Sequence, residues 1–191
     1  MKKTILAGVL LTIFGCTSAP TNSGPSTQGY AAAESAYRKG DYSGAISTAT
    51  KIITENPGMA KPYFLRAKSY QAKEKWKEAE DDFTMAIQES SEENRSVYLF
   101  WRGLFFSDRQ LHEKALLDLS RACELQLRFP STQYYLECFR SAAATRLALG
   151  QFEAAQKDCD FILSKNPDEK TRREFEALKL EAIQGRRNSA R

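Results

Sequence analysis

The sequence predicts an all-α protein, a tandem array of helix pairs that follows a secretion signal and a linker. Two observations carry this prediction. A pattern of small and aromatic residues returns four times at intervals close to 34 residues. Before it, a short apolar run stops at Cys16 and gives way to sequence rich in Ser, Thr and Pro.

The N-terminus has the pattern of a secretion signal. Lys2 and Lys3 precede an apolar segment, Ile5–Gly15, of eleven residues. A helix that crosses a bilayer needs about 20 apolar residues. The segment is therefore too short to span a membrane, and we leave it out of the fold prediction.

The end of this segment resembles the lipobox of bacterial lipoproteins. The residues in question are Ile13-Phe14-Gly15-Cys16, with bulky side chains where an ordinary cleavage site has small ones. The resemblance implies a signal peptide over 1–15 and a mature chain that begins at Cys16, with its thiol diacylglycerylated and its amine acylated, for example with palmitate. Each buried CH₂ of such chains contributes about 0.8 kcal/mol to anchoring. The alternative is a cysteine that only happens to lie near a cleavage site.

The resemblance also implies a location. Thr17, rather than Asp, follows the cysteine. This is similar to the lipoproteins sorted to the outer membrane, where an organism has one. We therefore expect a lipid-anchored protein on a bacterial membrane, at the outer membrane and facing the periplasm.

Residues 16–28 are predicted to form a flexible tether. From Thr17 to Gln28 the chain is uncharged, rich in Ser, Thr, Pro and Gly, and without apolar periodicity. Such a segment buries too little apolar surface to offset the conformational entropy that it would lose on ordering. Twelve residues of it span roughly 20 Å.

The net charge of the chain is small. The formal charge of +4 includes Lys2 and Lys3, so the rest of the chain carries about +2. This charge is too small to indicate a nucleic-acid partner.

Two columns of small residues define the repeat. One column lies at intervals of 34, 36 and 40 residues: Ala45, Ala79, Ala115 and Ala155. The other lies twelve residues earlier in each unit: Ala33, Ala67, Gly103 and Ala143. Small residues at regular positions let paired helices approach closely. Gly40 and Gly150 are expected to end the first helix of their units, and Asp41 to cap the helix that follows.

This pattern resembles the tetratricopeptide repeat (TPR), a helix–turn–helix unit with a period of 34 residues. The resemblance covers four units over 29–167 and implies an α-solenoid. The third unit departs from it, with Gln110 in place of the turn glycine and His112 in place of the aromatic residue. The fourth has Arg146 where a large apolar residue is usual.

The longer spacings and the C-terminus complete the predicted array. Spacings of 36 and 40 imply insertions around Ser90–Asn94 and Leu127–Gln133. Residues 168–191 are expected to form a capping helix, from about Asp168 to Ile183, and a basic tail. One side of that helix is predicted to pack on the array: Phe175, Ala177, Leu178 and Leu180.

No catalytic, metal or cofactor site is expected. His112 is the only histidine and occupies an aromatic packing column, and no phosphate-binding loop or nucleophile motif occurs. Cys159 is expected to be a small buried residue. A Cys123–Cys138 disulfide across the second insertion is a hypothesis, and the odd number of remaining cysteines leaves one free or paired with another chain.

The resemblance implies that the first helices of the units line a concave groove for a partner. The residues predicted to bind there are Tyr37, Phe64, Lys68, Gln71, Phe100, Leu104 and Arg140. This set is mainly apolar and aromatic, which suits an amphipathic helix or an extended apolar segment. The apolar run Val97–Phe106 is either part of an exposed binding surface or covered by the longer third and fourth units; both interpretations stay open.

These observations predict a non-catalytic, membrane-anchored scaffold or adaptor for assembly or regulation of a cell-envelope complex. Its partners would be envelope proteins, and the lipid anchor would hold it to the membrane. One alternative is a pilotin-like lipoprotein that assists assembly of a type IV pilus or secretin. Another is a structural homo-oligomer, paired through the groove or a free cysteine. An enzyme with an unrecognised site is the third.

Overall fold

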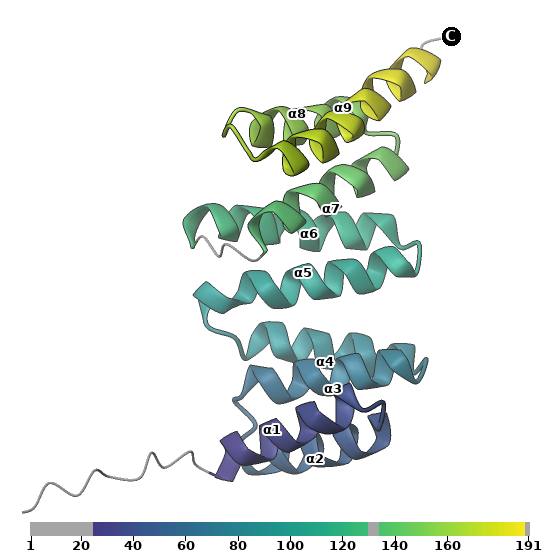
Figure 1. Cartoon of the computed structure of the whole chain (residues 1–191). Helices are drawn as coiled ribbons and strands as arrows, with labels where there is room; N and C mark the ends of the chain where they lie inside the picture. The colour runs from purple at the N-terminus through teal and green to yellow at the C-terminus, as the bar shows by residue number, and fades with distance from the viewer. Residues whose placement is uncertain (1–24, 130–133, 190–191) are drawn as a thin grey trace, which may run out of the picture.

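The computed structural model describes residues 25–129 and 134–189, and this part of the chain forms nine helices and no strand. The helices are α1 (Pro25–Arg38), α2 (Tyr42–Glu55), α3 (Ala60–Ala72), α4 (Trp76–Gln88), α5 (Glu92–Asp108), α6 (His112–Arg128), α7 (Tyr135–Ala148), α8 (Phe152–Leu163) and α9 (Glu169–Ser189). They stack in chain order, with α1 and α2 at one end and α8 and α9 at the other (Figure 1). The predicted all-α array of four helix pairs and a final helix is confirmed.

The turn inside each helix pair has one geometry in all four units. The turn residue is left-handed in each, with φ of 80° at Gly40, 57° at Glu74, 57° at Gln110 and 70° at Gly150. The next N–H donates to a carbonyl five residues back, as from Leu111 N to Phe106 O at 2.9 Å. This is the Schellman arrangement that ends helices. Loss of the glycine at residue 110 therefore does not alter the turn.

The predicted helix cap at Asp41 is confirmed, whereas α1 begins earlier than predicted. The Gly44 N–H donates to Asp41 Oδ1 at 2.8 Å. Helix α1 starts at Pro25, so the array begins four residues before the predicted boundary at residue 29. Proline suits a first helical turn because that turn has no partner for its N–H groups.

The third unit uses its extra residues to lengthen its helices. Helices α5 and α6 have 17 residues each, against 13 each in α3 and α4. The insertion predicted at Ser90–Asn94 lies where α5 begins. The second predicted insertion, Leu127–Gln133, starts at the end of α6, and residues 130–133 lie outside the described part of the chain.

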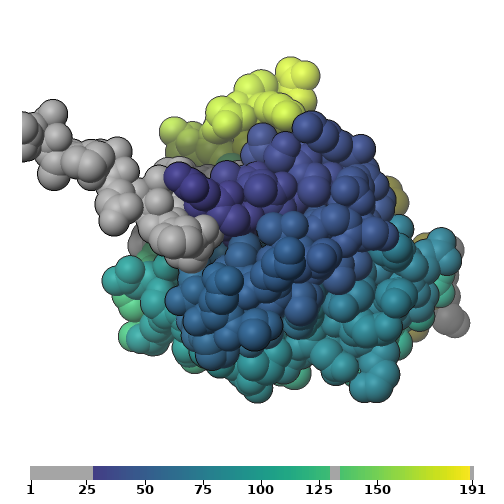
Figure 2. All heavy atoms as spheres, turned by 90° about the horizontal axis from the view of Figure 1, so that it is seen from below, coloured from purple at the N-terminus to yellow at the C-terminus, as the bar shows by residue number. Residues whose placement is uncertain are grey.

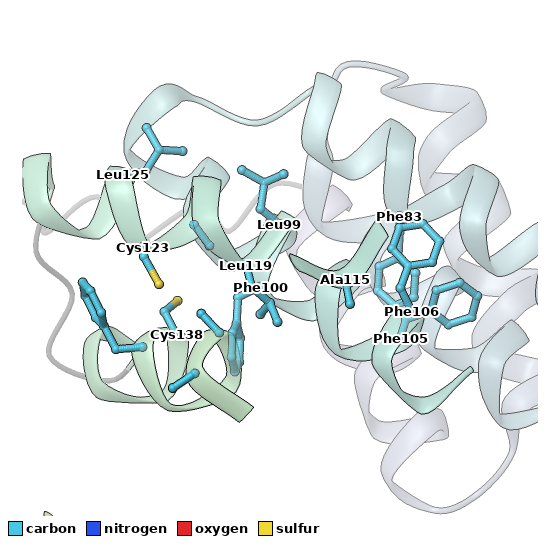
Figure 3. Packing of buried hydrophobic residues seen from close by; sticks show 14 of the residues in the cluster. Phe83, Leu99, Phe100, Phe105, Phe106, Ala115, Leu119, Cys123, Leu125 and Cys138 are labelled. Atoms are coloured by element: carbon cyan, nitrogen blue, oxygen red, sulfur yellow. The ribbon is translucent and has the colours of Figure 1, made fainter. Parts of the chain in front are cut away.

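The small-residue columns lie at the contacts between paired helices, as predicted. Ala33, Ala67 and Ala143 are completely buried. A Cβ atom added to Gly103 would lie 2.8 Å from Leu119 Cγ, too close for a carbon–carbon contact. The main apolar cluster extends from this contact through α5, α6 and α7 (Figure 3).

A recurring polar group joins each helix pair to the unit before it. In the second unit, the Arg66 guanidinium donates to Asp82 Oδ2 at 2.7 Å and to Thr50 Oγ1 at 3.0 Å. Asp82 is on the second helix of the same unit, and Thr50 is on the second helix of the previous one. The third unit repeats the group with the same residue types: Arg102, Asp118 and Thr84.

The fourth unit forms this group with Arg146. Its guanidinium pairs with Asp158 and donates to Ser120 Oγ at 3.2 Å. Asp158 and Ser120 occupy the repeat positions of the aspartate and the hydroxyl in the other units. Arg146 lies one helical turn after the repeat position of the other arginines. Arg146 is therefore part of the array's ion pairs and replaces the expected apolar side chain without shifting the register of α7.

The last helix covers the C-terminal end of the array through part of the predicted face, since Phe175 and Leu178 pack on the array. Helix α9 packs against α7 and α8 and buries Thr171, Phe175 and Ala182. Leu178 is half-buried, as predicted, but Ala177 and Leu180 are exposed. The residues that face the array are spaced by four, three and four positions: Thr171, Phe175, Leu178 and Ala182. The helix continues to Ser189. In the view onto the α1–α2 end, C-terminal residues extend beyond the outline of the first units (Figure 2).

Candidate functional site

An open groove crosses the first three units, and we refer to it as the aromatic groove. Its volume is about 490 Å³. Its lining residues come from α1, α3, the start of α4 and the end of α5: Tyr37, Lys68, Gln71, Ala72, Trp76, Trp101, Phe105, Asp108 and Arg109. Trp76 and Trp101 are the two tryptophans of the chain. The groove therefore combines large aromatic surfaces with charged side chains.

Lys68 lies within a cage of aromatic rings. Its Nζ is 4.6 Å from the ring centroid of Trp101, 5.0 Å from that of Tyr37 and 5.6 Å from that of Phe64. Ring faces attract a cation electrostatically. Burial lowers the pKa of Lys68, and the nearby Glu34 carboxylate opposes this shift. The ammonium is held in place without a carboxylate as its direct partner among the described residues.

Trp76 and Arg109 form the second cation–ring pair of the groove. The Arg109 guanidinium lies 4.2 Å from the ring centroid of Trp76, whose side of the groove also contains Phe105. Trp76 is the first residue of α4, and Arg109 follows α5 in the turn of the next unit. The repeated turn geometry thus places an exposed indole and an exposed guanidinium together. Trp76 is 37% exposed, which is high for a tryptophan.

Three of the seven predicted groove residues line the aromatic groove: Tyr37, Lys68 and Gln71. Phe64 lies next to the groove lining. Its ring is half-buried and packs on Trp101, which lines the groove, and on Tyr98. The other three predicted residues do not line it: Phe100, Leu104 and Arg140.

Phe100 and Arg140 have neighbours in the fourth unit and the capping helix. Phe100 is only 4% exposed, with its ring 5.6 Å from that of Tyr134. Leu104 packs against the main apolar cluster. Arg140 forms ion pairs with Glu137 and with Glu174 of α9. The run Val97–Phe106 is therefore mostly covered, and it contributes Trp101 and Phe105 to the lining of the groove.

Sequence reasoning missed five lining residues besides Ala72: Trp76, Trp101, Phe105, Asp108 and Arg109. Trp76 and Arg109 belong to turns rather than to the first-helix columns from which the groove was predicted. Trp101 is the neighbour of a predicted residue, one position along α5. Trp76 and Arg109 lie in the turn regions of successive units. Comparing the turn residues of each unit with those of the next could have indicated this pair.

Cys123 and Cys138 face each other between α6 and α7 (Figure 3). Both are buried, and all three cysteines in the described residues are free thiols. A hydrogen bond with Cys138, together with burial, raises the pKa of Cys123. The predicted disulfide is not formed in this structure, although its two sulfurs are adjacent. Cys159 is completely buried, as expected.

The described residues contain no group of His, Cys, Asp and Glu that could hold a metal ion. His112 begins α6, is half-buried and does not line the aromatic groove. Over residues 25–129 and 134–189, no helix is long and apolar enough to cross a membrane. Cys16 and the predicted signal peptide lie outside the described residues.

The chain matches no protein-family model and no curated sequence. Its structure is similar to that of pilF of Pseudomonas aeruginosa, with a TM-score of 0.66 and 16% identity over 84% of this chain and 72% of that one. YrrB, a TPR protein with an unusual peptide-binding site, gives 0.58 and 17% over 80% and 82%. A thermophilic TPR protein of Thermus thermophilus gives 0.60 and 18% over 83% and 84%. The fold is therefore that of a TPR solenoid, as the repeat pattern predicts.

Proposed function

We propose that the chain is a non-catalytic scaffold that holds a segment of a partner protein in the aromatic groove while a lipid on Cys16 anchors it to a membrane. The observation that carries this proposal is the groove itself. Both tryptophans of the chain border one open surface, beside an arginine and a lysine. Tryptophan, tyrosine and arginine dominate the binding energy of protein interfaces, and large exposed aromatic surfaces are otherwise uncommon on monomers.

The position of the groove fits the capture of an extended or helical segment. It is built from three successive units and is open to solvent along its length. Peptides bind such surfaces through side chains that enter gaps between rings. The similarity to YrrB, whose peptide-binding site is noted above, agrees with this proposal at the level of the fold.

Site-specific photo-crosslinking from intact membranes tests the groove. A photoreactive phenylalanine analogue replaces Gln71, which lines the groove, or Lys51, which is exposed on α2 outside it. The proposal predicts a discrete product with an envelope protein from position 71 and none from position 51. Products from position 51 alone would contradict it. A product with twice the mass of the chain would support the structural homo-oligomer instead.

The anchor is tested separately. A Cys16→Ser chain is expected to be soluble in the envelope or to remain unprocessed, because it lacks the thiol that carries the lipid. Fractionation of membranes, followed by immunoblotting, measures this. A Cys16→Ser chain that fractionates with membranes as the wild type does would contradict the anchor assignment.

A further inference from the structure

The two cations of the aromatic groove have no carboxylate partner within the described part of the chain. Ion pairs of 4.0 Å or less are formed there by other basic residues, but by neither Lys68 nor Arg109. Glu34, the acid close to Lys68, pairs with Arg38 at 2.8 Å. Aromatic rings contact both cations, yet a ring cannot accept the directed hydrogen bonds that an ammonium or guanidinium donates to a carboxylate.

The groove also contains one acid, Asp108, next to Arg109 in the sequence. Its carboxylate forms no ion pair with a described residue. Together with Lys68 and Arg109 it leaves the lining with a small positive excess. A single acidic side chain is therefore complementary to the groove, whereas a run of several acids would be repelled by Asp108.

We propose that the aromatic groove recognises a partner through one internal Asp or Glu side chain that pairs with Lys68, beside an aliphatic or aromatic residue that covers Trp76 and Trp101. This inference rests on the proposed function and specifies the chemistry of its partner. Arg109, which lies over Trp76, supplies a second positive charge at the edge of the same surface.

The segments that flank the array in this sequence contain no such acid. Residues 1–24 contain no Asp or Glu and are charged only at Lys2 and Lys3. In residues 182–191 the charged side chains are all basic: Arg186, Arg187 and Arg191. Charge complementarity therefore favours a segment of another protein over these two segments.

The environment of Lys68 adds a pH dependence. Because burial lowers the pKa of Lys68, the free protein loses this positive charge at a lower pH than an exposed lysine would. A bound carboxylate favours the charged form and raises that pKa again. Binding of an acidic segment is thus expected to weaken as pH rises through the pKa of Lys68 in the free protein.

Peptide display on the full chain in detergent tests the inference. The probe is a library of random twelve-residue peptides joined to the display protein at their C-termini, so that no peptide has a free terminal carboxylate. We expect the selected sequences to contain one Asp or Glu beside a large apolar residue. Tryptophan fluorescence then measures affinity, and its whole signal comes from the groove because both tryptophans line it.

The decisive comparison is a double-mutant cycle. Lys68→Gln, or Asn or Gln in place of the peptide's acid, is expected to weaken binding about tenfold, equivalent to about 1.4 kcal/mol. Combining both changes should cost little more than either alone, and Lys68→Arg should retain binding. Lys61→Gln, exposed on the same helix, is the matched control and should have no effect.

Each other outcome overturns the inference in a distinguishable way. Selected peptides without an acid, or with equal affinity for Lys68→Gln, would refute the acidic anchor and leave the proposed function in place. Selection of no peptide would contradict both the anchor and the groove as a binding site.

Discussion

The left-handed turn residue of each unit shows how individual residues depart from the repeat without changing it. Gly40 and Gly150 adopt this conformation freely, whereas Glu74 and Gln110 adopt it with side chains that make it unfavourable. A left-handed conformation costs a residue other than glycine about 1–2 kcal/mol. The turns inside the second and third helix pairs therefore carry backbone strain that those inside the first and fourth do not.

Replacing the strained residue should stabilise the protein. Gln110→Gly is expected to raise the free energy of unfolding by about 1 kcal/mol, because glycine adopts φ near +57° without steric cost. Urea denaturation followed by circular dichroism measures this. The control, Gln88→Gly at the end of α4, should lower stability by about 1 kcal/mol. A loss of stability at position 110 as well would contradict the turn analysis.

The facing thiols of Cys123 and Cys138 support a second prediction at this scale. Protein that carries Cys16→Ser and is isolated from an oxidising compartment should, once denatured, show one free thiol without reductant and three with it. In the reduced native protein, the hydrogen bond with Cys138 and burial raise the pKa of Cys123, so this thiol stays protonated at neutral pH and reacts slowly with alkylating agents.

Thiol titration makes the comparison, with a Cys138→Ser variant as the control. That variant should show two thiols in both conditions. Three thiols without reductant in the parent protein would mean that the bridge does not form.

At the scale of helices, the ion pairs between units decide how the pairs stack. Arg102 contacts Asp118 within its own unit and Thr84 in the previous one. The side chains of Arg102 and Asp118 are only 19% and 5% exposed. Removing one partner of such a pair leaves the other charge poorly solvated. These groups are thus stronger determinants of stability than the exposed ion pairs along single helices.

Asp118→Ala should therefore lower the free energy of unfolding by about 3 kcal/mol. The matched control is Asp81→Ala, whose pair with Lys77 is highly exposed and whose loss should cost less than about 0.5 kcal/mol. Urea denaturation of both variants makes the comparison. Equal losses would show that the groups between units do not have the proposed role.

The sequence predicts the helix pairs better than it predicts the site. Columns of small residues and turn glycines report local requirements that repeat every unit, so Ala67, Gly103 and Gly150 identify the helices correctly. Exposure of a first-helix residue depends on neighbours far along the chain. Phe100 is buried beside Tyr134, and Arg140 forms an ion pair with Glu174 of α9. No periodicity within one unit contains that information.

At the scale of the molecule, both tryptophans lie on one open surface in the first three units, the aromatic groove. In the third unit, Phe100 of α5 is buried beside Tyr134 and does not add to that surface. The first unit is also the one that directly follows the proposed membrane tether. A partner in the groove would therefore be held close to the membrane.

The most direct test of the central claim uses the two indole N–H signals in a ¹⁵N NMR spectrum. Both tryptophans line the aromatic groove, so these signals report only on that surface. The partner segment identified by crosslinking from position 71 is added to labelled protein, with Lys68→Gln as the comparison. Both indole signals are expected to shift in the wild type. A segment that binds by calorimetry while both signals stay unmoved would contradict it.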